Sequence, residues 1–171
     1  MLLSGCSFFS KSKPKLYSLE PVPGTAVAAV RGTPIAIGSL ELPPDLDRRE
    51  VAVRKADHQL EARPSELWSA TLQSLTLHAL AFDLASRLPE GMIVLPGAAQ
   101  TATPRAIDVI IGDFAAGPEP RVVLDARWTM GGVTHHEQIA IDITSLDSAQ
   151  IAAGMSQALA QLADRIVAQI K

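Results

Sequence analysis

The chain is 171 residues long, and its 19% charged and 47% hydrophobic residues describe one globular domain with a tail, not a disordered chain. A formal net charge of −3 lacks the lysine and arginine excess that nucleic-acid binding needs. The sequence holds no run of about 18 apolar residues, the length of a membrane-spanning helix. The one cysteine, Cys6, excludes an internal disulfide framework and argues against a thiolate metal site.

The first residues resemble a bacterial lipobox. Leu3-Ser4-Gly5-Cys6 is an aliphatic residue, two small residues and a cysteine in that order. Cleavage before Cys6 would leave a thiol for acylation, and each buried methylene of the acyl chains contributes about 0.8 kcal/mol to membrane binding. A signal peptide needs about 7–15 apolar residues before its cleavage site, but this chain offers only Met1-Leu2-Leu3. Two alternatives stay open: the true start codon lies upstream, or the match is chance and Cys6 is a buried free cysteine.

The residues after the cysteine have the composition of a tether. Residues 7–15 are polar and basic except for two adjacent phenylalanines. We therefore assign residues 1–15 to a lipoprotein signal remnant and tether, and residues 16–171 to a single α/β domain.

Short strands are predicted in the first part of the domain. They are expected over residues 16–19, 33–42, 51–54 and 58–61. Pro21 and Pro23 follow the first of these, and Pro43-Pro44 follows the second, because proline cannot donate a hydrogen bond to a β-ladder.

A long helix is predicted over residues 64–88, where apolar side chains recur at helical spacing. Pro64 or Ser65 suits its first turn, and Pro89 with Gly91 ends it. The continuous apolar run at residues 92–95 predicts a short strand that is buried on both faces.

Three strand-length runs follow at residues 106–114, 121–130 and 133–143. In the second run apolar and polar residues alternate, and Gly131-Gly132 suits a two-residue hairpin that joins it to the third. The pattern predicts an antiparallel meander with one buried face.

A second helix is predicted over residues 145–171, with apolar residues three or four positions apart. Asp147 and Gln150 suggest a capping box, and Gly154 marks a close crossing over the sheet. The predicted fold class is therefore α/β: a mixed, largely antiparallel sheet, two long helices packed on one face, and a three-stranded meander near the end.

No arrangement of residues in the sequence predicts catalysis. His135 and His136 are adjacent on a strand and point to opposite faces, so they cannot readily share a metal. Asp108, Asp113 and Asp125 fit a solvated outer face, and so does Asp142. Phosphate-binding glycine loops and nucleophile elbows are missing from the sequence. We expect no enzyme activity, no metal site and no cofactor.

The order of these features resembles the ABC-type transport auxiliary lipoprotein family, the PqiC-like partners of MCE lipid-transport systems. The lipobox, the strand around Tyr17-Ser18-Leu19 and the strand at Ile35-Ala36-Ile37-Gly38 carry the resemblance. Residues 42–51, Leu-Pro-Pro-Asp-Leu-Asp-Arg-Arg-Glu-Val, are similar to the stretch LPxYLDRxxIV of that family. Asp45 stands where the family usually has an aromatic residue.

The resemblance implies a non-enzymatic subunit that is anchored through acylated Cys6 at the periplasmic face of the bacterial outer membrane. It implies an MCE-domain protein as partner and self-association into a homo-oligomer, such as a ring. The similar stretch makes Leu46, Asp47, Arg48 and Arg49 the candidate partner-binding residues.

Two other functions are weighed against this one. A soluble periplasmic lipid-binding chaperone would need an apolar cavity between the sheet and the helices. A hydrolase or metal enzyme would have to be built on His135 and Glu137.

Overall fold

The computed structural model describes residues 13–27, 30–99 and 103–170. Cys6 and the lipobox lie outside these residues. The elements are β1 (Lys15–Tyr17), β2 (Ile35–Glu41), β3 (Glu50–Arg54), β4 (Leu60–Trp68), α1 (Leu72–Arg87), β5 (Ile93–Val94), β6 (Arg105–Ala116), β7 (Arg121–Met130), β8 (Val133–Asp142) and α2 (Ser148–Gln169).

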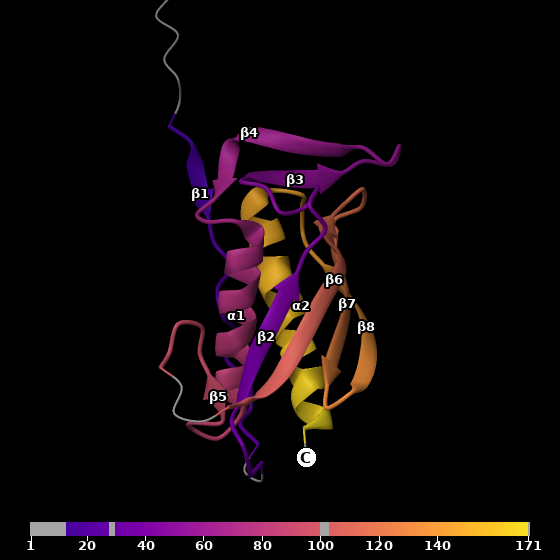
Figure 1. Ribbon diagram of the computed structural model, residues 1–171. Coiled ribbons are helices and arrows are strands. Elements are labelled where there is room, and N and C mark those ends of the chain that lie inside the picture. The colour runs from indigo at the N-terminus through magenta and orange to yellow at the C-terminus, as the bar shows by residue number, and fades with distance from the viewer. Residues whose placement is uncertain (1–12, 28–29, 100–102, 171) are drawn as a thin grey trace, which may run out of the picture.

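Both helices pack on one face of a curled sheet (Figure 1). The alternation along β6 shows which face this is, because Ile107 and Val109 are buried whereas the intervening Asp108 and Ile110 are exposed. A strand turns successive side chains to opposite faces, so the second face of the sheet meets solvent. The expectation of a mixed α/β fold with two helices is therefore confirmed.

The direction of the strands differs from the expectation. The strands pair in the order β1-β4-β3-β6-β2-β5, and β7 and β8 extend the sheet from β6. Among the described residues, four of the seven pairings are parallel and three are antiparallel. The sheet is therefore mixed, as predicted, but the prediction that it is largely antiparallel was wrong. Alternation along a strand predicts its burial but carries no signal for its direction relative to a partner far away in sequence.

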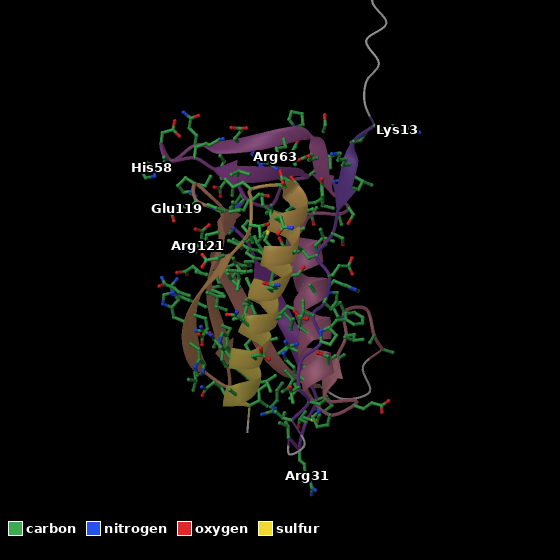
Figure 2. The ribbon with its side chains drawn as sticks, turned by 180° about the vertical axis from the view of Figure 1, so that it is seen from behind. Lys13, Arg31, His58, Arg63, Glu119 and Arg121 are labelled. Atoms are coloured by element: carbon green, nitrogen blue, oxygen red, sulfur yellow. The ribbon has the colours of Figure 1, made fainter. Side chains whose placement is uncertain are left out.

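β3 and β4 form an arm that crosses the end of the helices (Figure 1). β3 pairs with β6 at one position, Val53 with Ala116, so the arm leaves the main sheet there. Figure 2 shows His58 at the tip of the arm, at the end of the molecule where Lys13 lies and opposite Arg31. The β3–β4 arm and the start of the described chain therefore share one end of the protein.

The first helix begins later than predicted, at Leu72 instead of Pro64. Residues 64–68 belong to β4, where the N–H of Trp68 donates to the carbonyl oxygen of Arg49 at 2.7 Å and Trp68 pairs with Tyr17 of β1. Thr71 caps the helix by accepting from the N–H of Ser74. The spacing of apolar residues before position 72 fits either a helix or a strand, and pairing with two neighbouring strands decides for the strand.

Residues 19–27 form an extended segment, here called the strap, that ties the start of the domain to both helices. Backbone N–H groups of alternate residues donate to helix side chains: Glu20 to Ser156 of α2, and Val22 and Gly24 to Asp83 and Ser86 of α1. A period of two is that of an extended chain, so the N–H groups of these three residues point to the same side, toward the helices.

α2 lies across β7 and β8, and Gly154 allows the close approach. A Cβ at this position would lie 2.7 Å from Cγ2 of Ile143 and 2.9 Å from Cγ2 of Val122. The predicted close crossing at Gly154 is thus confirmed. Asp147 occupies the N-cap as expected, but its carboxylate accepts from the hydroxyl of Ser145 and makes no capping bond, so the predicted capping box is absent.

β5 also departs from the expectation. It is a two-residue edge strand, and its residues Ile93 and Val94 are half-buried. The apolar run that predicted burial on both faces lies beside β2 at the margin of the sheet, where one neighbour is missing.

Candidate functional site

The predicted partner-binding residues lie in the turn between β2 and β3. The carbonyl oxygen of Pro43 accepts from the N–H groups of Leu46 and Asp47 at 2.9 and 3.1 Å, which closes a tight turn. Leu46 is 6% exposed and belongs to the hydrophobic core, so it anchors the turn. The structure brings Leu46, Asp47, Arg48 and Arg49 into one compact segment, here called the docking segment.

Asp47 fastens the docking segment to α1. Its Oδ1 accepts from the N–H of Gln73 in the first turn of the helix at 2.9 Å. Such free N–H groups carry the positive end of the helix dipole and favour an acidic side chain. The amide of Gln73 in turn donates to the carbonyl oxygen of Leu40 at the end of β2. Asp47 and Gln73 thus link the docking segment to α1, and Gln73 also links α1 to β2.

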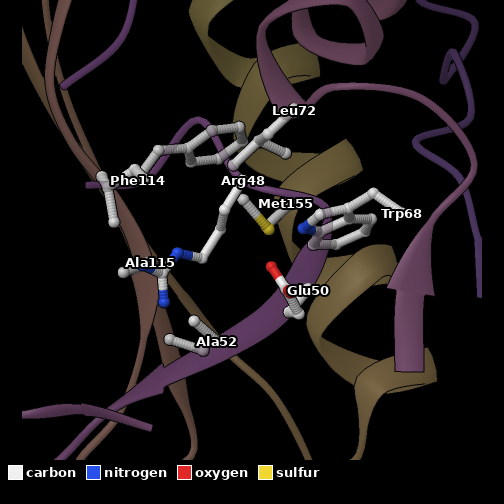
Figure 3. Close-up of a pocket in the computed structure, with 10 residues that line it drawn as sticks. Arg48, Glu50, Ala52, Trp68, Leu72, Phe114, Ala115 and Met155 are labelled. Atoms are coloured by element: carbon white, nitrogen blue, oxygen red, sulfur yellow. The ribbon is translucent and has the colours of Figure 1, made fainter. Parts of the chain in front are cut away.

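Arg48 enters a narrow crevice where β3 separates from β6. Figure 3 shows its side chain running between Phe114 and Ala115, with the carboxylate of Glu50 on the other side of the crevice. The crevice has a volume of about 20 Å³, enough for one water molecule and too little for a substrate. The Nε of Arg48 is buried and has no hydrogen-bond partner.

Arg48 and Arg49 differ from most other arginines of the described chain because neither forms an ion pair. The arginines that do are Arg54, Arg63, Arg87, Arg121, Arg127 and Arg165. The side chain of Arg49 is exposed, and its backbone carbonyl is the acceptor for Trp68. Unpaired guanidinium groups on a fixed turn are suited to donate to carboxylates or carbonyl oxygens of another protein, because each presents several donors in a rigid geometry.

The histidine pair is accounted for within the fold. His135 stacks on Trp128 with ring centroids 4.1 Å apart, whereas His136 lies on the opposite face, 3.0 Å from the carboxylate of Asp125. The predicted opposite orientation of these two residues is confirmed. Hydrogen bonds from Gln138 and from His136 hold the pKa of Asp125 below its ordinary value.

The remaining candidates for metal or acid–base chemistry are also engaged. Glu137 accepts from Arg165 of α2 at 2.7 Å, and Asp113 receives two bonds from Arg54 at 2.6 and 2.8 Å. Within residues 13–27, 30–99 and 103–170, no three His, Cys, Asp or Glu side chains gather as metal ligands would. The geometry of the described residues thus gives His135 and Glu137 structural contacts and no shared site.

Sequence reasoning missed a buried polar cluster where the strap meets α1. Asp83 is fully buried, and burial raises its pKa to about 6. Arg87, 3% exposed, lies one helical turn away and donates to the carboxylate of Asp164 on α2 and to the carbonyl oxygen of Val22 on the strap. A carboxylate within the apolar face of a predicted helix was the available signal, because such a residue is rarely buried without partners.

An open apolar groove lies between β1 with the start of the strap and α2. It has a volume of about 480 Å³ and is lined by Leu16, Tyr17 and Val22 on one side and by alanines of α2 on the other. Leu16 is 62% exposed. The groove is on the surface of the helical layer and not between the helices and the sheet, where the chaperone hypothesis placed its cavity.

The described part of the chain offers no helix that combines the length and the apolar character required to cross a membrane.

Comparison with known proteins identifies the family of this chain. The model of the family described as ABC-type transport auxiliary lipoprotein component matches residues 17–167. Among curated proteins no match is found.

Two solved structures share the fold. One, described as an uncharacterized protein, has a TM-score of 0.76 and 16% identity and covers 94% of this chain and 100% of its own. The other comes from Xanthomonas campestris and is described as a member of family DUF330. It has a TM-score of 0.66 and 15% identity, and the match covers 90% of this chain and 92% of that one. At these identities the likeness establishes a common fold.

Proposed function

Because this chain belongs to the family of ABC-type transport auxiliary lipoprotein components, we propose that it is a non-enzymatic subunit of an MCE-type intermembrane lipid transport system. In this proposal acyl chains on Cys6 hold it at the periplasmic face of the outer membrane, and the docking segment binds an MCE-domain protein. We include self-association of several copies in the proposal. Membership supports association with an ABC-type transport system and with the cell envelope.

The docking proposal rests on Arg48, whose buried Nε has no hydrogen-bond partner. Most buried side-chain polar atoms in proteins have a hydrogen-bond partner, and one without a partner is destabilising. The Nε of Arg48 has none, although the rest of the docking segment is bonded to α1 and β4. The crevice admits no more than a water molecule beside this Nε, so an acceptor group from a second protein would bind the outer guanidinium nitrogens of Arg48.

The position of the segment agrees with a role close to the membrane. The docking segment leads into the β3–β4 arm, which lies at the same end of the molecule as Lys13 (Figure 2). Because Lys15 already belongs to β1, a tether over residues 7–14 reaches at most about 30 Å when fully extended. An anchored protein therefore presents the docking segment within a few tens of ångströms of the lipid surface.

The docking proposal is tested by reversing charge at the segment. We expect the double variant Arg48→Glu and Arg49→Glu to lose capture of the MCE protein from the same gene cluster by at least about tenfold, because two donors become acceptors. The matched control is Arg121→Glu and Arg127→Glu, the same charge change at exposed arginines of β7. Equal capture by the wild type and the docking variant would remove the segment from the proposal.

The anchor is tested separately. Expression with the native upstream sequence followed by mass spectrometry should show a chain that starts at Cys6 and carries acyl groups, and Cys6→Ala should release the protein from the membrane fraction. An unmodified N-terminus would contradict the anchor and leave the docking proposal standing.

The alternative function, a lipid-binding chaperone, has one supporting observation. The groove beside β1 has a volume of about 480 Å³ and a largely apolar lining, which suits part of an acyl chain. Native mass spectrometry of the purified protein decides: a bound lipid that is lost in Ala153→Gln, a change inside the groove, would favour the chaperone.

A further inference from the structure

The outer edge of β8 is open. β8 pairs only with β7 among the described residues, and its ten residues keep one register from Val133 to Asp142 without a bulge. Figure 1 shows β8 at the margin of the sheet, with no further element beside it. A long regular edge strand is a template for pairing with another strand.

The hydrogen-bond pattern determines which residues of β8 face outward. The N–H of Ile143 donates to the carbonyl oxygen of Pro120 at 2.9 Å, and Val133 pairs with Met130 across the two-residue hairpin. Odd-numbered residues therefore bond to β7, and even-numbered residues direct their N–H and C=O groups to the open edge. The outward residues are Thr134, His136, Gln138, Ala140 and Asp142, whose side chains are all exposed.

The other edges of the described sheet are protected. β1 and β5 are three and two residues long. β4 contains Pro64 and a shift of register opposite Glu50. Natural proteins use short length, proline, lysine and bulges to prevent edge pairing. β8 has no proline, lysine or glycine and no bulge, so its edge lacks each of these devices.

We propose that β8 pairs antiparallel with β8 of a second copy of this chain, with Gln138 on the two-fold axis. This register pairs all five outward residues, because Gln138 is the middle one. Moving the centre by one outward residue in either direction leaves residues at the end of the strand without a partner.

The side chains in this register are complementary. Gln138 faces Gln138 of the second copy, His136 faces Ala140, and Thr134 faces Asp142. No two like charges are opposed, and the threonine hydroxyl can donate to the carboxylate. The Nε2 of Gln138 already donates to Asp125 at 2.9 Å, which holds the amide in place and leaves its Oε1 to accept from the second copy.

A disulfide tests the register. Residues in a hydrogen-bonded antiparallel pair have Cα atoms about 5.5 Å apart, a distance that a disulfide spans without strain. In the full chain with Cys6→Ser, Gln138→Cys should form a covalent dimer under mild oxidation. The matched control is Thr134→Cys, whose copies would lie about 27 Å apart in this register and stay monomeric. Equal cross-linking of the two variants, or none in either, overturns the proposal.

A charge tests the same pairing without covalent chemistry. Gln138→Lys keeps a donor toward Asp125 but sets two like charges face to face on the axis. We therefore expect the dissociation constant of the dimer, measured by sedimentation, to rise at least about tenfold. Gln157→Lys, an exposed change on α2, should leave the dimer unchanged. A wild type that sediments as a monomer at about 100 µM, or a dimer that tolerates Gln138→Lys, overturns the proposal. The pairing rests on the proposed self-association and supplies one two-fold contact, which closes at two copies, so a larger assembly would need a second interface. It involves neither Cys6 nor the docking segment, so loss of MCE capture and loss of the dimer are separable results.

Discussion

Arg87 and Arg48 both turn a guanidinium group into the protein, but their surroundings differ. Arg87 donates to the carboxylate of Asp164, to the carbonyl oxygens of Val22 and Asp83, and to a neighbouring hydroxyl. Arg48 ends in the crevice between β3 and β6, and its buried Nε has no partner. The fold supplies hydrogen-bond acceptors for the guanidinium group of Arg87 but none for the Nε of Arg48.

The difference separates a structural role from a binding role. Burial of an unpaired polar group is destabilising, so a charge that serves the fold is surrounded by acceptors, as Arg87 is. The Nε of Arg48 lacks such an acceptor, as do two nitrogens of Arg105, but Arg48 lies next to the exposed Arg49 on the docking segment, so we assign this pair to binding. The comparison predicts that removal of Arg87 affects folding and that removal of Arg48 affects binding.

The largest effect is expected for Arg87→Met. This change leaves Asp83 buried without its neighbouring positive charge and removes the bonds to the strap, so we expect the free energy of unfolding to fall by about 3–5 kcal/mol. Urea unfolding followed by circular dichroism measures it. The control is Arg165→Met, which removes an exposed pair with Glu137 and should cost at most about 1 kcal/mol. Equal losses in the two variants would contradict a structural role specific to Arg87.

The next effect is a dependence of stability on pH that arises from Asp83. Burial raises the pKa of this carboxyl from 3.8 to about 6 in the folded protein. Between these values the folded state binds a proton that the unfolded state does not, so the free energy of unfolding should rise as the pH falls from about 7 to about 4. The gain is about 2–3 kcal/mol for a shift of this size.

Asp83→Asn isolates this contribution. The amide oxygen can still accept from the N–H of Val22, but it does not titrate, so the difference between the wild type and the variant should follow pH over this window. The lowered pKa values of Glu66 and Asp125 act in the opposite direction, because their stabilisation is lost as the pH falls through those lowered values. They are common to both proteins and cancel in the difference. A pH-independent difference would show that Asp83 is charged throughout.

An intermediate effect is expected for Arg63→Met. Arg63 is half-buried and joins β4 to the start of α2, donating to Glu66, to the hydroxyl of Ser148 and to the carbonyl oxygen of Leu146. In the variant, water can bind some of the groups that Arg63 contacted, so we expect the free energy of unfolding to fall by about 1–2 kcal/mol. Arg121→Met, which removes an exposed pair with Asp142, should lose less. If Arg63→Met matched the loss in Arg87→Met, the degree of burial would not order these arginines.

The sequence predicted local features well because they depend on local chemistry. Gly131-Gly132 and the alternation in residues 121–130 located a hairpin strand, and adjacent histidines on a strand were assigned to opposite faces. Properties that depend on distant residues were not predictable. The parallel pairing of β2 with β6 and the cluster of Asp83 with Arg87 and the strap both join segments about 60 residues or more apart. One sequence contains no direct signal for such contacts.

The candidate site shows the same division. Similarity to the family stretch selected the docking segment, but it did not distinguish the residues within it. The structure does: Leu46 is in the core, Asp47 holds the first turn of α1, and Arg48 and Arg49 lack ion-pair partners. A motif of this kind combines residues that place the turn with residues that are available for binding, and only their contacts separate the two.

The smallest effect on stability is expected for Arg48→Met, and this result tests the comparison most sharply. Methionine keeps much of the aliphatic stem that lies against Phe114 and removes a buried donor without a partner, so the free energy of unfolding should change by less than about 1 kcal/mol and can rise. Urea unfolding of this variant beside Arg87→Met gives the contrast. Capture of the MCE protein should weaken at the same time, because the group that the fold leaves unsatisfied is gone. A loss of stability as large as that of Arg87→Met, with unchanged capture, would mean that Arg48 serves the fold and that the crevice is not a docking site.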